Sequence, residues 1–402
     1  MKKIIALLLA AMMVVGMFAA CGNTNAPAET EAPAAQETEA PAETEAQVTE
    51  VTLKVWAPQE DQVNEDSWLI QVQKQFEAAH PEYKITWQNG VCPEGDAATM
   101  VTADPAAAAD VYMFANDQLG TLLQAGALAK LGGSYLEQVK TDVSATYVNT
   151  VPSTDGNVYG FPVAPNTWFM YYNKELVGDA DLTSLESILE KGKVAFELKN
   201  SWYLPAFFFA AGGTLFGDTG ADAAAGVNFG GEIGLNATNA VLDLLANPNF
   251  VVDGDGYGNA GLKDGTVAAP TVMMNGAPAQ LKAYAGSKAV GVNPNASNPK
   301  AAMQFAAFLA SADSQLLRFQ LRNITPAVTA LAENADVAAS IVAVAESNTM
   351  AYASFAQPTI AEMNPVWGPV GTFGTNLADG TVTAENAAEM VDLLNEQLNG
   401  GL

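Results

Sequence analysis

Few side chains in this sequence are suited to covalent catalysis. His80 is the only histidine, and it stands at the expected end of a helix directly before Pro81, where a surface position is the simpler interpretation. The chain contains no Gly-x-Ser-x-Gly, Walker-loop, Cys-x-x-Cys or His-x-x-Glu-His pattern. Hydrolysis by a pair of carboxylates needs no local motif and stays open as an alternative. The patterns favour a binding protein over an enzyme, and we expect no cofactor.

One acidic segment is similar to a calcium-binding loop only in part. Asp253 and Asp255 occupy the first and third positions of such a loop, and Asp264 occupies the twelfth. The fifth position is Tyr257, and the glutamate usual at the twelfth is lacking. We therefore expect a surface loop ahead of a helix, and no metal site.

The elements that would position a site follow from the hydrophobic pattern. Alternating apolar residues predict strands over 51–56 and 83–87, and apolar spacings of three and four predict a helix that begins after Asp66 or Ser67. Residues 110–114 read as a third, buried strand. A strand, a helix and a strand in so short a span imply a right-handed parallel unit, and ligands usually lie beyond the carboxyl ends of such strands.

The stretch Gly156 to Leu176 divides the chain. Pro162 and Pro165 exclude a helix and favour an extended segment from Phe161 to Asn166. The large apolar residues 168–172 then predict a strand buried on both faces. Such a segment suits a passage from one α/β lobe to another, although an ordinary loop entering an interior strand would have the same pattern.

The same stretch, from Gly160 to Lys174, reads Gly-Phe-Pro-Val-Ala-Pro-Asn-Thr-Trp-Phe-Met-Tyr-Tyr-Asn-Lys. It resembles the first hinge crossing of extracellular solute-binding proteins of the maltose/maltodextrin type, where Gly-x-Pro-x-x-x-(Glu/Asn)-Thr-x-x-x-x-Tyr-Asn-Lys occurs. The resemblance continues in the same order to the C-terminus, with further crossings near 285–293 and 323–328. It implies an α/β, two-lobed periplasmic-binding-protein-like fold with three hinge crossings, whose lobes close like jaws.

The resemblance also implies where the two lobes begin and end. We expect the N-terminal lobe at 49–164 and 290–327, and the C-terminal lobe at 165–289 and 328–402. One departure concerns the second lobe: after Thr266–Ala269 the family continues into a Gly-x-Trp turn, a helix and another strand, whereas this chain runs straight into Pro270. We therefore expect a shortened second lobe without that strand pair and its tryptophan.

Ligand contacts are implied from both lobes and from the first crossing. Aromatic rings would cover the apolar faces of a sugar, while carboxylates and amides would bind its rim of hydroxyl groups. The positions expected in the first lobe are Trp56, Gln59, Glu60, Asp61, Phe114, Asn116 and Asp117. Those expected in the crossing and the second lobe are Asn166, Trp168, Asn200, Trp202, Tyr203 and Trp367.

Several of these positions have a purely structural alternative. Trp168 lies in a predicted buried strand and could belong to the core, while Glu60 and Asp61 could form a solvated loop without a ligand. Trp202 and Trp367 stand beside polar or glycine-rich turns, which favours a place at the ligand. The aromatic residues of the second lobe are therefore the better candidates.

Three positions depart from the family in charge. Asn166 and Asn200 stand where a glutamate is frequent, and Gln118 stands where an arginine is frequent. Fewer charges beside the ligand would suit a different glycan. The leading ligand class is a maltodextrin-like α-glucan, and the linkage and chain length stay open.

The N-terminus carries export signals. Two lysines, an apolar run over 4–18 and Ala-Ala-Cys at 19–21 look like a bacterial lipobox, which predicts a signal peptide over 1–20 and a lipidated Cys21. The apolar run is shorter than the ~20 residues of a membrane-spanning helix. Residues 21–48 form a linker of alanine, proline, glutamate and threonine that we expect to be disordered.

Charge and cysteine content limit the partners. A formal charge of −27 argues against nucleic acid and anionic lipid as partners. With Cys21 lipidated, Cys92 is the only other cysteine, so no internal disulfide can form. We expect a monomeric, lipid-anchored protein on the extracellular face of a bacterial cell membrane, which passes an oligosaccharide to the permease of an ABC transporter. A surface protein or adhesin without a transport role, or a degenerate paralogue that no longer closes, is the alternative.

Overall fold

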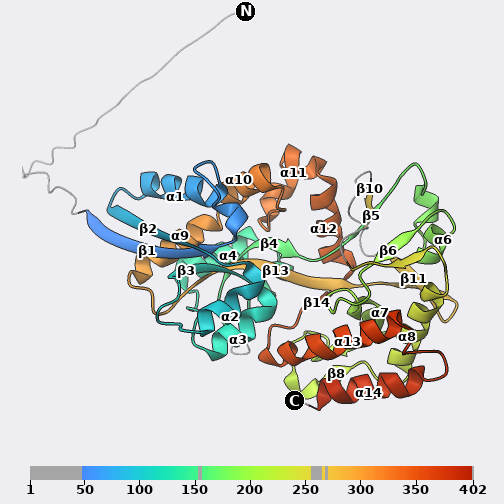
Figure 1. The fold of residues 1–402 in the computed structure, drawn as a ribbon. Helices are drawn as coiled ribbons and strands as arrows, with labels where there is room; N and C mark the ends of the chain where they lie inside the picture. The colour runs from blue at the N-terminus through green and yellow to red at the C-terminus, as the bar shows by residue number, and fades with distance from the viewer. Residues whose placement is uncertain (1–47, 153–155, 255–264, 268–269, 401–402) are drawn as a thin grey trace, which may run out of the picture. The chain divides into compact units, whose positions relative to one another are not determined.

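The computed structural model describes residues 48–152, 156–254, 265–267 and 270–400 (Figure 1). These residues belong to one compact unit, Gln47–Leu402. The expected signal peptide, Cys21 and most of the linker lie outside the described residues. Among the helices that the structure describes, none is long and apolar enough to span a membrane.

A mixed sheet of six strands forms the largest β-structure. Its strands are β1 (Thr49–Ala57), β2 (Tyr83–Val91), β3 (Val111–Ala115), β4 (Phe161–Asn166), β13 (Ala283–Val292) and β14 (Ser354–Ala356). They lie in the order β14-β13-β3-β1-β2, and β4 pairs with β13. β1 runs parallel to β2 and β3, whereas β13 runs antiparallel to β3 and β4. The strands predicted near 51–56, 83–87 and 110–114 are confirmed.

Helices cover this sheet and complete the first lobe. They are α1 (Trp68–Ala79), α2 (Ala97–Thr102), α3 (Leu119–Gln124), α4 (Gly133–Asp142), α5 (Ala145–Val148), α9 (Pro299–Leu309) and α10 (Ala312–Arg322). A further helix, α11 (Ala335–Ala339), lies after the expected end of this lobe and contacts the 3-10 helix η7 (Thr329–Glu333). The predicted helix after Ser67 is α1, which ends at Ala79 ahead of Pro81 and buries Leu69, Val72 and Phe76. These side chains join a first apolar cluster between the sheet and its helices. Cys92 is fully buried in the same cluster, and burial raises the pKa of its thiol to about 11.

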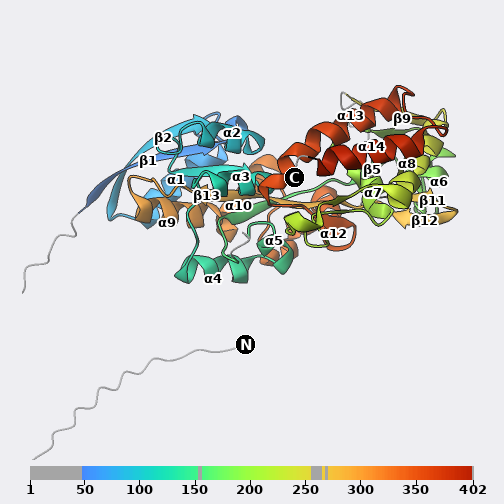
Figure 2. The same cartoon turned by 90° about the horizontal axis from the view of Figure 1, so that it is seen from below.

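The second lobe contains short paired strands and a separate core. Its strand pairs are β5 (Met170–Tyr172) with β10 (Gly265–Val267), β6 (Val194–Phe196) with β9 (Phe250–Val252), β7 (Thr214–Leu215) with β8 (Val227–Asn228), and β11 (Thr271–Met274) with β12 (Ala277–Gln280). Its helices are α6 (Leu185–Leu189), α7 (Pro205–Ala210), α8 (Gly231–Leu245), α12 (Ile341–Tyr352), α13 (Trp367–Ala378) and α14 (Ala387–Asn399). Figure 2 shows α13 and α14 side by side, in contact with α8. A second apolar cluster, rich in phenylalanine, fills this lobe.

The second lobe continues from Pro270 without the family's Gly-x-Trp turn and helix, since residues 270–298 contain no helix. The antiparallel strands β11 and β12 form a short hairpin there that the sequence patterns did not predict. Its turn is Asn275-Gly276, and both residues have positive φ, at 52° and 76°. Asn-Gly is the sequence that a two-residue hairpin turn favours, because both central residues must adopt this left-handed geometry. The hairpin itself contains no tryptophan.

Extended segments connect the two cores. β4 contributes Phe161 and Val163 to the first cluster, and Trp168 just after it belongs to the second. β13 runs the other way, with Tyr284 in the second cluster and Ala289 in the first. The lobe boundaries expected from the sequence remain a prediction. β13 nevertheless holds residues of both cores on one strand, and the segment that begins with β4 reaches the second core two residues after the strand ends.

Candidate ligand-binding site

Three aromatic side chains from distant parts of the chain gather in the second lobe. We call Trp202, Tyr284 and Trp367 the aromatic wall. The ring centroids are 4.9 Å apart for Trp202 and Tyr284, 6.1 Å for Trp202 and Trp367, and 5.7 Å for Tyr284 and Trp367. Tyr284 is only 1% exposed, whereas both indoles are half-buried. Each tryptophan thus keeps part of its surface exposed.

Residues close in sequence hold Trp202 in the turn that precedes α7. The side-chain oxygen of Asn200 accepts a hydrogen bond of 2.9 Å from the Trp202 backbone amide, and its Nδ2 donates to Glu197 at 3.0 Å. Pro205 then opens α7 at the first helical turn, where proline is favoured. Asn200 is exposed, but its amide holds this turn. Its observed role is therefore to position Trp202.

A carboxylate of the first lobe lies close to the aromatic wall. Asp117 is in the short 3-10 helix η3 (Asn116–Gln118) that follows β3. Burial raises the pKa of Asp117 to about 6. Burial, together with the charge of Asp117, also raises the pKa of Tyr284. Within the described part of the chain the Tyr284 hydroxyl has no hydrogen-bond partner, so this corner combines aromatic faces, a free hydroxyl and an acid.

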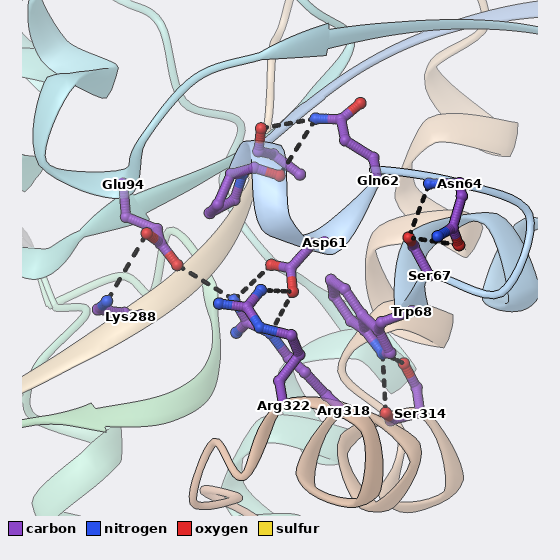
Figure 3. A network of polar contacts seen from close by, with 12 residues as sticks. Asp61, Gln62, Asn64, Ser67, Trp68, Glu94, Lys288, Ser314, Arg318 and Arg322 are labelled. Atoms are coloured by element: carbon purple, nitrogen blue, oxygen red, sulfur yellow. Dashed lines mark hydrogen bonds and ion pairs between the residues drawn. The ribbon is translucent and has the colours of Figure 1, made fainter.

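The loop after β1 splits into exposed and buried residues. Gln59 and Glu60 are exposed on the 3-10 helix η1 (Gln59–Asp61), whereas Asp61 is fully buried. Figure 3 shows Asp61 between two arginines of α10: its Oδ2 lies 2.6 Å from Nη2 of Arg318, and its Oδ1 lies 2.7 Å from Nη1 of Arg322. The structure thus differs from the expectation of a ligand contact at Asp61, because arginines far along the chain occupy both carboxylate oxygens.

The same arginine connects further charges, as Figure 3 shows. Arg318 Nη2 lies 3.2 Å from Glu94, and the other carboxylate oxygen of Glu94 lies 3.6 Å from Nζ of Lys288 on β13. Burial alone would raise the pKa of Glu94, but Lys288 and Arg318 outweigh it, and the pKa is lowered. We call Asp61, Glu94, Lys288, Arg318 and Arg322 the buried ionic network. It fixes the loops after β1 and β2 against α10.

Trp56 lies at the carboxyl end of β1 and is half-buried. It pairs with Gly90 of β2, and a Cβ atom at Gly90 would lie 2.5 Å from Cδ1 of the indole. Only glycine therefore leaves room for this ring over the neighbouring strand. Trp56 keeps some exposed surface at the same end of the sheet as Gln59 and Glu60.

Three other predicted residues lie in the interior. Phe114 and Asn116 are fully buried, and Asn116 Oδ1 accepts a hydrogen bond of 2.9 Å from the Ser287 amide on β13. Trp168 is 8% exposed and packs on Phe196 with ring centroids 6.0 Å apart. These positions differ from the expected ligand contacts, because β3 is buried throughout and Trp168 packs into the second core. The strand predicted over 168–172, buried on both faces, is observed only as β5 (Met170–Tyr172), in which Tyr172 alone is buried.

Two cavities are lined by residues of the segments that connect the lobes. A cavity of about 390 Å³ in the second lobe is lined by Trp168, Tyr203, Glu346 and other residues, but by no member of the aromatic wall. A smaller polar cavity of about 210 Å³ is lined by Asn166, Thr167, Lys288, Thr325 and Glu346, among others. Asn166 and Tyr203, both expected at the ligand, therefore face cavities and not the aromatic wall.

Metal binding finds no support in the described ranges. They contain no cluster of three or more histidine, cysteine, aspartate or glutamate side chains suited to a metal ion. The acidic segment considered for calcium lies mostly at 255–264, outside the described residues.

Sequence patterns did not point to Tyr284 or Arg318. Tyr284 directly precedes the expected second crossing, and the apolar run of β13 could have suggested it as a wall residue. Arg318 looks like an ordinary helical cation, and only its burial at 3% exposure reveals that it holds the network together. No local signal links it to Asp61.

Two cores joined by extended strands, with aromatic side chains beside the junction, define a two-lobed α/β binding protein. The family described as "Bacterial extracellular solute-binding protein" matches residues 71–343, and this chain belongs to it. This confirms the resemblance found in the sequence.

Named relatives bind oligosaccharides. The chain is 26% identical over 331 residues to a galactooligosaccharide-binding protein of Bacillus subtilis (strain 168), covering 70% of this chain and 75% of that protein. It is 26% identical over 336 residues to a maltooligosaccharide ABC transporter solute-binding lipoprotein of Streptococcus pneumoniae serotype 4, covering 72% of this chain and 76% of the relative.

Solved structures agree on the fold. One structure "with acarbose" is 41% identical, has a TM-score of 0.82, and is matched over 88% of this chain and all of that one. A maltodextrin binding protein from L. casei BL23, solved without ligand, is 23% identical with a TM-score of 0.79 and is matched over 87% of this chain and 99% of that one. The two-lobed fold of maltose-binding-type proteins is thereby confirmed.

Proposed function

We propose that this chain binds an oligosaccharide between its two lobes and delivers it to the permease of an ABC transporter. The observation that carries this proposal is the aromatic wall, in which two half-buried indoles pack on Tyr284, a residue within reach of the charge of Asp117. A sugar ring presents apolar faces to such indoles and hydroxyl donors to a carboxylate. The names of the relatives point to the same ligand class.

The proposed binding mode uses both lobes. Trp202 and Trp367 stack against the sugar, while Asp117, Glu60 and Gln59 accept or donate hydrogen bonds from the first lobe. Trp56 extends the apolar surface there, and Asn166 contributes from the crossing. A ligand that touches both lobes stabilises a closed conformation, which the permease then distinguishes from the open one. Stacking on several rings is compatible with micromolar affinity, about −8 kcal/mol.

Maltodextrin is the proposed ligand, although one relative is named for galactooligosaccharides. Acarbose, which names one similar structure, is a further candidate ligand. Asn166 and Asn200 carry amides where related proteins often carry acids, and this change favours a ligand bound through fewer charged contacts. The sugar panel below separates these classes.

We further propose a lipid anchor at Cys21 and a tether formed by residues 21–48. This arrangement keeps the binding domain at the extracellular face of the membrane while leaving it free to meet its permease. The relative from Streptococcus pneumoniae is named as a lipoprotein. We propose no catalytic activity, because the family consists of solute-binding proteins.

Calorimetric titration of the domain from Gln47 onward tests the proposal. The panel contains maltose, maltotriose, longer dextrins, galactooligosaccharides and acarbose. We expect saturable binding to one class, weakened at least tenfold by Trp202→Ala or Trp367→Ala. Tyr352→Ala is the matched control, because Tyr352 is an aromatic side chain that is 82% exposed outside the wall. A folded domain that binds no glycan would overturn the sugar assignment.

A further inference from the structure

We propose that Glu346 is a positioning residue whose ionisation biases the hinge between the lobes, so that ligand affinity responds to pH through a group remote from the ligand. The inference rests on the proposed function and adds a form of regulation to the same site. It is carried by the polar cavity of about 210 Å³ and by the charges around it.

The cavity lies where the connecting segments meet. The end of β4 lines it with Asn166 and Thr167, and β13 lines it with Lys288. The segment after α10 contributes Thr325, and α12 contributes Glu346. β13 holds residues of both apolar clusters, and the chain passes from the first cluster on β4 to Trp168 of the second two residues after that strand. Any rotation of one lobe against the other must therefore change the walls of this cavity.

Glu346 is the titratable group in this cavity that faces several elements at once. Burial raises the pKa of Glu346 to about 7, while the Thr325 hydroxyl and Lys288 work against this rise. Tyr147 of α5 and Tyr171 of β5 are within reach of the charge of Glu346, and burial together with this charge raises their pKa values. Lys288 is the cation that faces the carboxyl group.

The buried ionic network carries an excess positive charge, which attracts the carboxylate of Glu346 through Lys288. Two carboxylates, Asp61 and Glu94, face three cations in that network. The network therefore has one positive charge in excess, and ionised Glu346 supplies the negative charge that balances it. Lys288 is the member of the network that lines the cavity, where Glu346 is also a lining residue, and its Nζ lies 3.6 Å from Glu94.

The network also connects this cavity to Gln59 and Glu60, the exposed residues of the first lobe that we place at the ligand. Asp61 belongs to the same 3-10 helix as Gln59 and Glu60, and it is held by two arginines of α10. α10 ends at Arg322, and the next residues enter the cavity wall. The helix α10 thus contacts both regions: it holds the loop that carries Gln59 and Glu60, and the residues that follow it line the polar cavity.

An ionised carboxylate in a cavity needs water or a cation, whereas the neutral acid tolerates a dry or distorted wall. The open and closed conformations therefore hold the Glu346 proton with different strength. Linkage then requires that ligand binding takes up or releases protons near pH 7. A difference of half a pKa unit between the two conformations changes affinity about threefold across this pH range and exchanges about 0.3 proton.

Calorimetry of the tightest-binding sugar in buffers of different ionisation enthalpy measures this exchange at pH 7. We expect a non-zero proton number for the wild type and its loss in Glu346→Gln, while affinity at low pH stays within twofold. Asp336→Asn removes an exposed acid of α11 and is the control. Asp117→Asn shows how much of the proton exchange comes from the acid of the candidate site, whose pKa of about 6 is lower than the pKa of about 7 of Glu346. Lys288→Met should move the Glu346 titration to higher pH.

A second measurement needs no ligand. Spin labels at Gln75→Cys and Glu389→Cys, exposed positions on α1 and α14, report the distance between the lobes, and the native Cys92 is fully buried. We expect the distance distribution to differ between pH 6 and pH 8, and to be independent of pH in Glu346→Gln.

The outcomes are distinguishable. A pH-dependent distance without any sugar binding would contradict the proposed function and support the hinge device. Sugar binding with the same proton number in wild type and Glu346→Gln, and a distance independent of pH, would overturn the inference. A folded Glu346→Gln variant with unchanged pH behaviour in both measurements would do the same.

Discussion

The buried ionic network and the aromatic wall place side chains against their usual preference: charged residues are buried in the first, and large apolar residues stay partly exposed in the second. In the first lobe, polar side chains next to strand ends turn inward and pair, with Asp61 fully buried and Arg318 3% exposed. In the second lobe, two large apolar side chains, Trp202 and Trp367, stay half-exposed. The charged residues hold the framework, and the aromatic residues keep exposed surface on which we propose that the ligand stacks.

This difference shows that residue type alone does not separate a structural role from a binding role. A buried charge is tolerated only with partners, so the Asp61 carboxylate is committed to Arg318 and Arg322. A half-buried indole carries no such requirement, because its remaining face is stable in water or under a sugar. The comparison can be tested from both sides.

The largest effect is expected from breaking the network. Asp61→Ala leaves Arg318 buried without its best partner, and we expect a loss of about 3–5 kcal/mol in the free energy of unfolding. Urea denaturation measures this loss. Glu60→Ala, at the exposed neighbour, is the control and should change stability by less than about 0.5 kcal/mol. If Asp61→Ala left stability intact and lowered sugar affinity, the structural role assigned to Asp61 would be wrong.

The aromatic wall should respond in the opposite way. Trp202→Ala and Trp367→Ala are expected to weaken binding of the proposed sugar by about 1–3 kcal/mol each. The two rings lie 6.1 Å apart and share one ligand surface, so their effects should not add. A double-mutant cycle by calorimetry checks this. Fully additive losses would show that the indoles contact separate parts of the ligand.

A smaller effect concerns pH and stability. The pKa of Glu346 is raised to about 7, so the folded protein holds this proton more firmly than the unfolded chain. Its contribution to stability is therefore fully present below the unfolded pKa near 4.5 and is lost as pH rises through 7. Relative to wild type, Glu346→Gln should gain about 1–2 kcal/mol between pH 4 and pH 8. Urea midpoints at several pH values test this, and a constant difference would refute it.

The smallest effect is expected at an exposed ion pair. Lys84 and Glu50 approach to 2.8 Å, almost as close as the partners of Asp61, but their side chains are 73% and 78% exposed. Solvent screens such a pair, so Lys84→Met should leave the urea midpoint unchanged within error. A clear loss of stability there would mean that distance, and not burial, decides the strength of ion pairs in this protein.

Much of the fold could be predicted from local patterns. Alternating apolar residues fixed β1 and β2, and the prolines of Phe161–Asn166 marked a connecting strand. The hairpin of β11 and β12 is not among the predicted elements, although its Asn275-Gly276 turn is a local signal for one. Turn chemistry is as local as apolar periodicity, so this element is also within reach of a sequence-based prediction.

The candidate site was predicted less completely. By itself the sequence determined which residues could stack on or bind a ligand, because residue type and neighbouring turns are local properties. Only the tertiary structure decided that Asp61 faces inward, because its partner Arg318 is 257 residues away. The same holds for Tyr284, which meets Trp202 and Trp367 only through packing of β13 against distant helices. Burial and long-range pairing are properties of the folded chain, and they assign each polar or aromatic side chain to the framework or to the site.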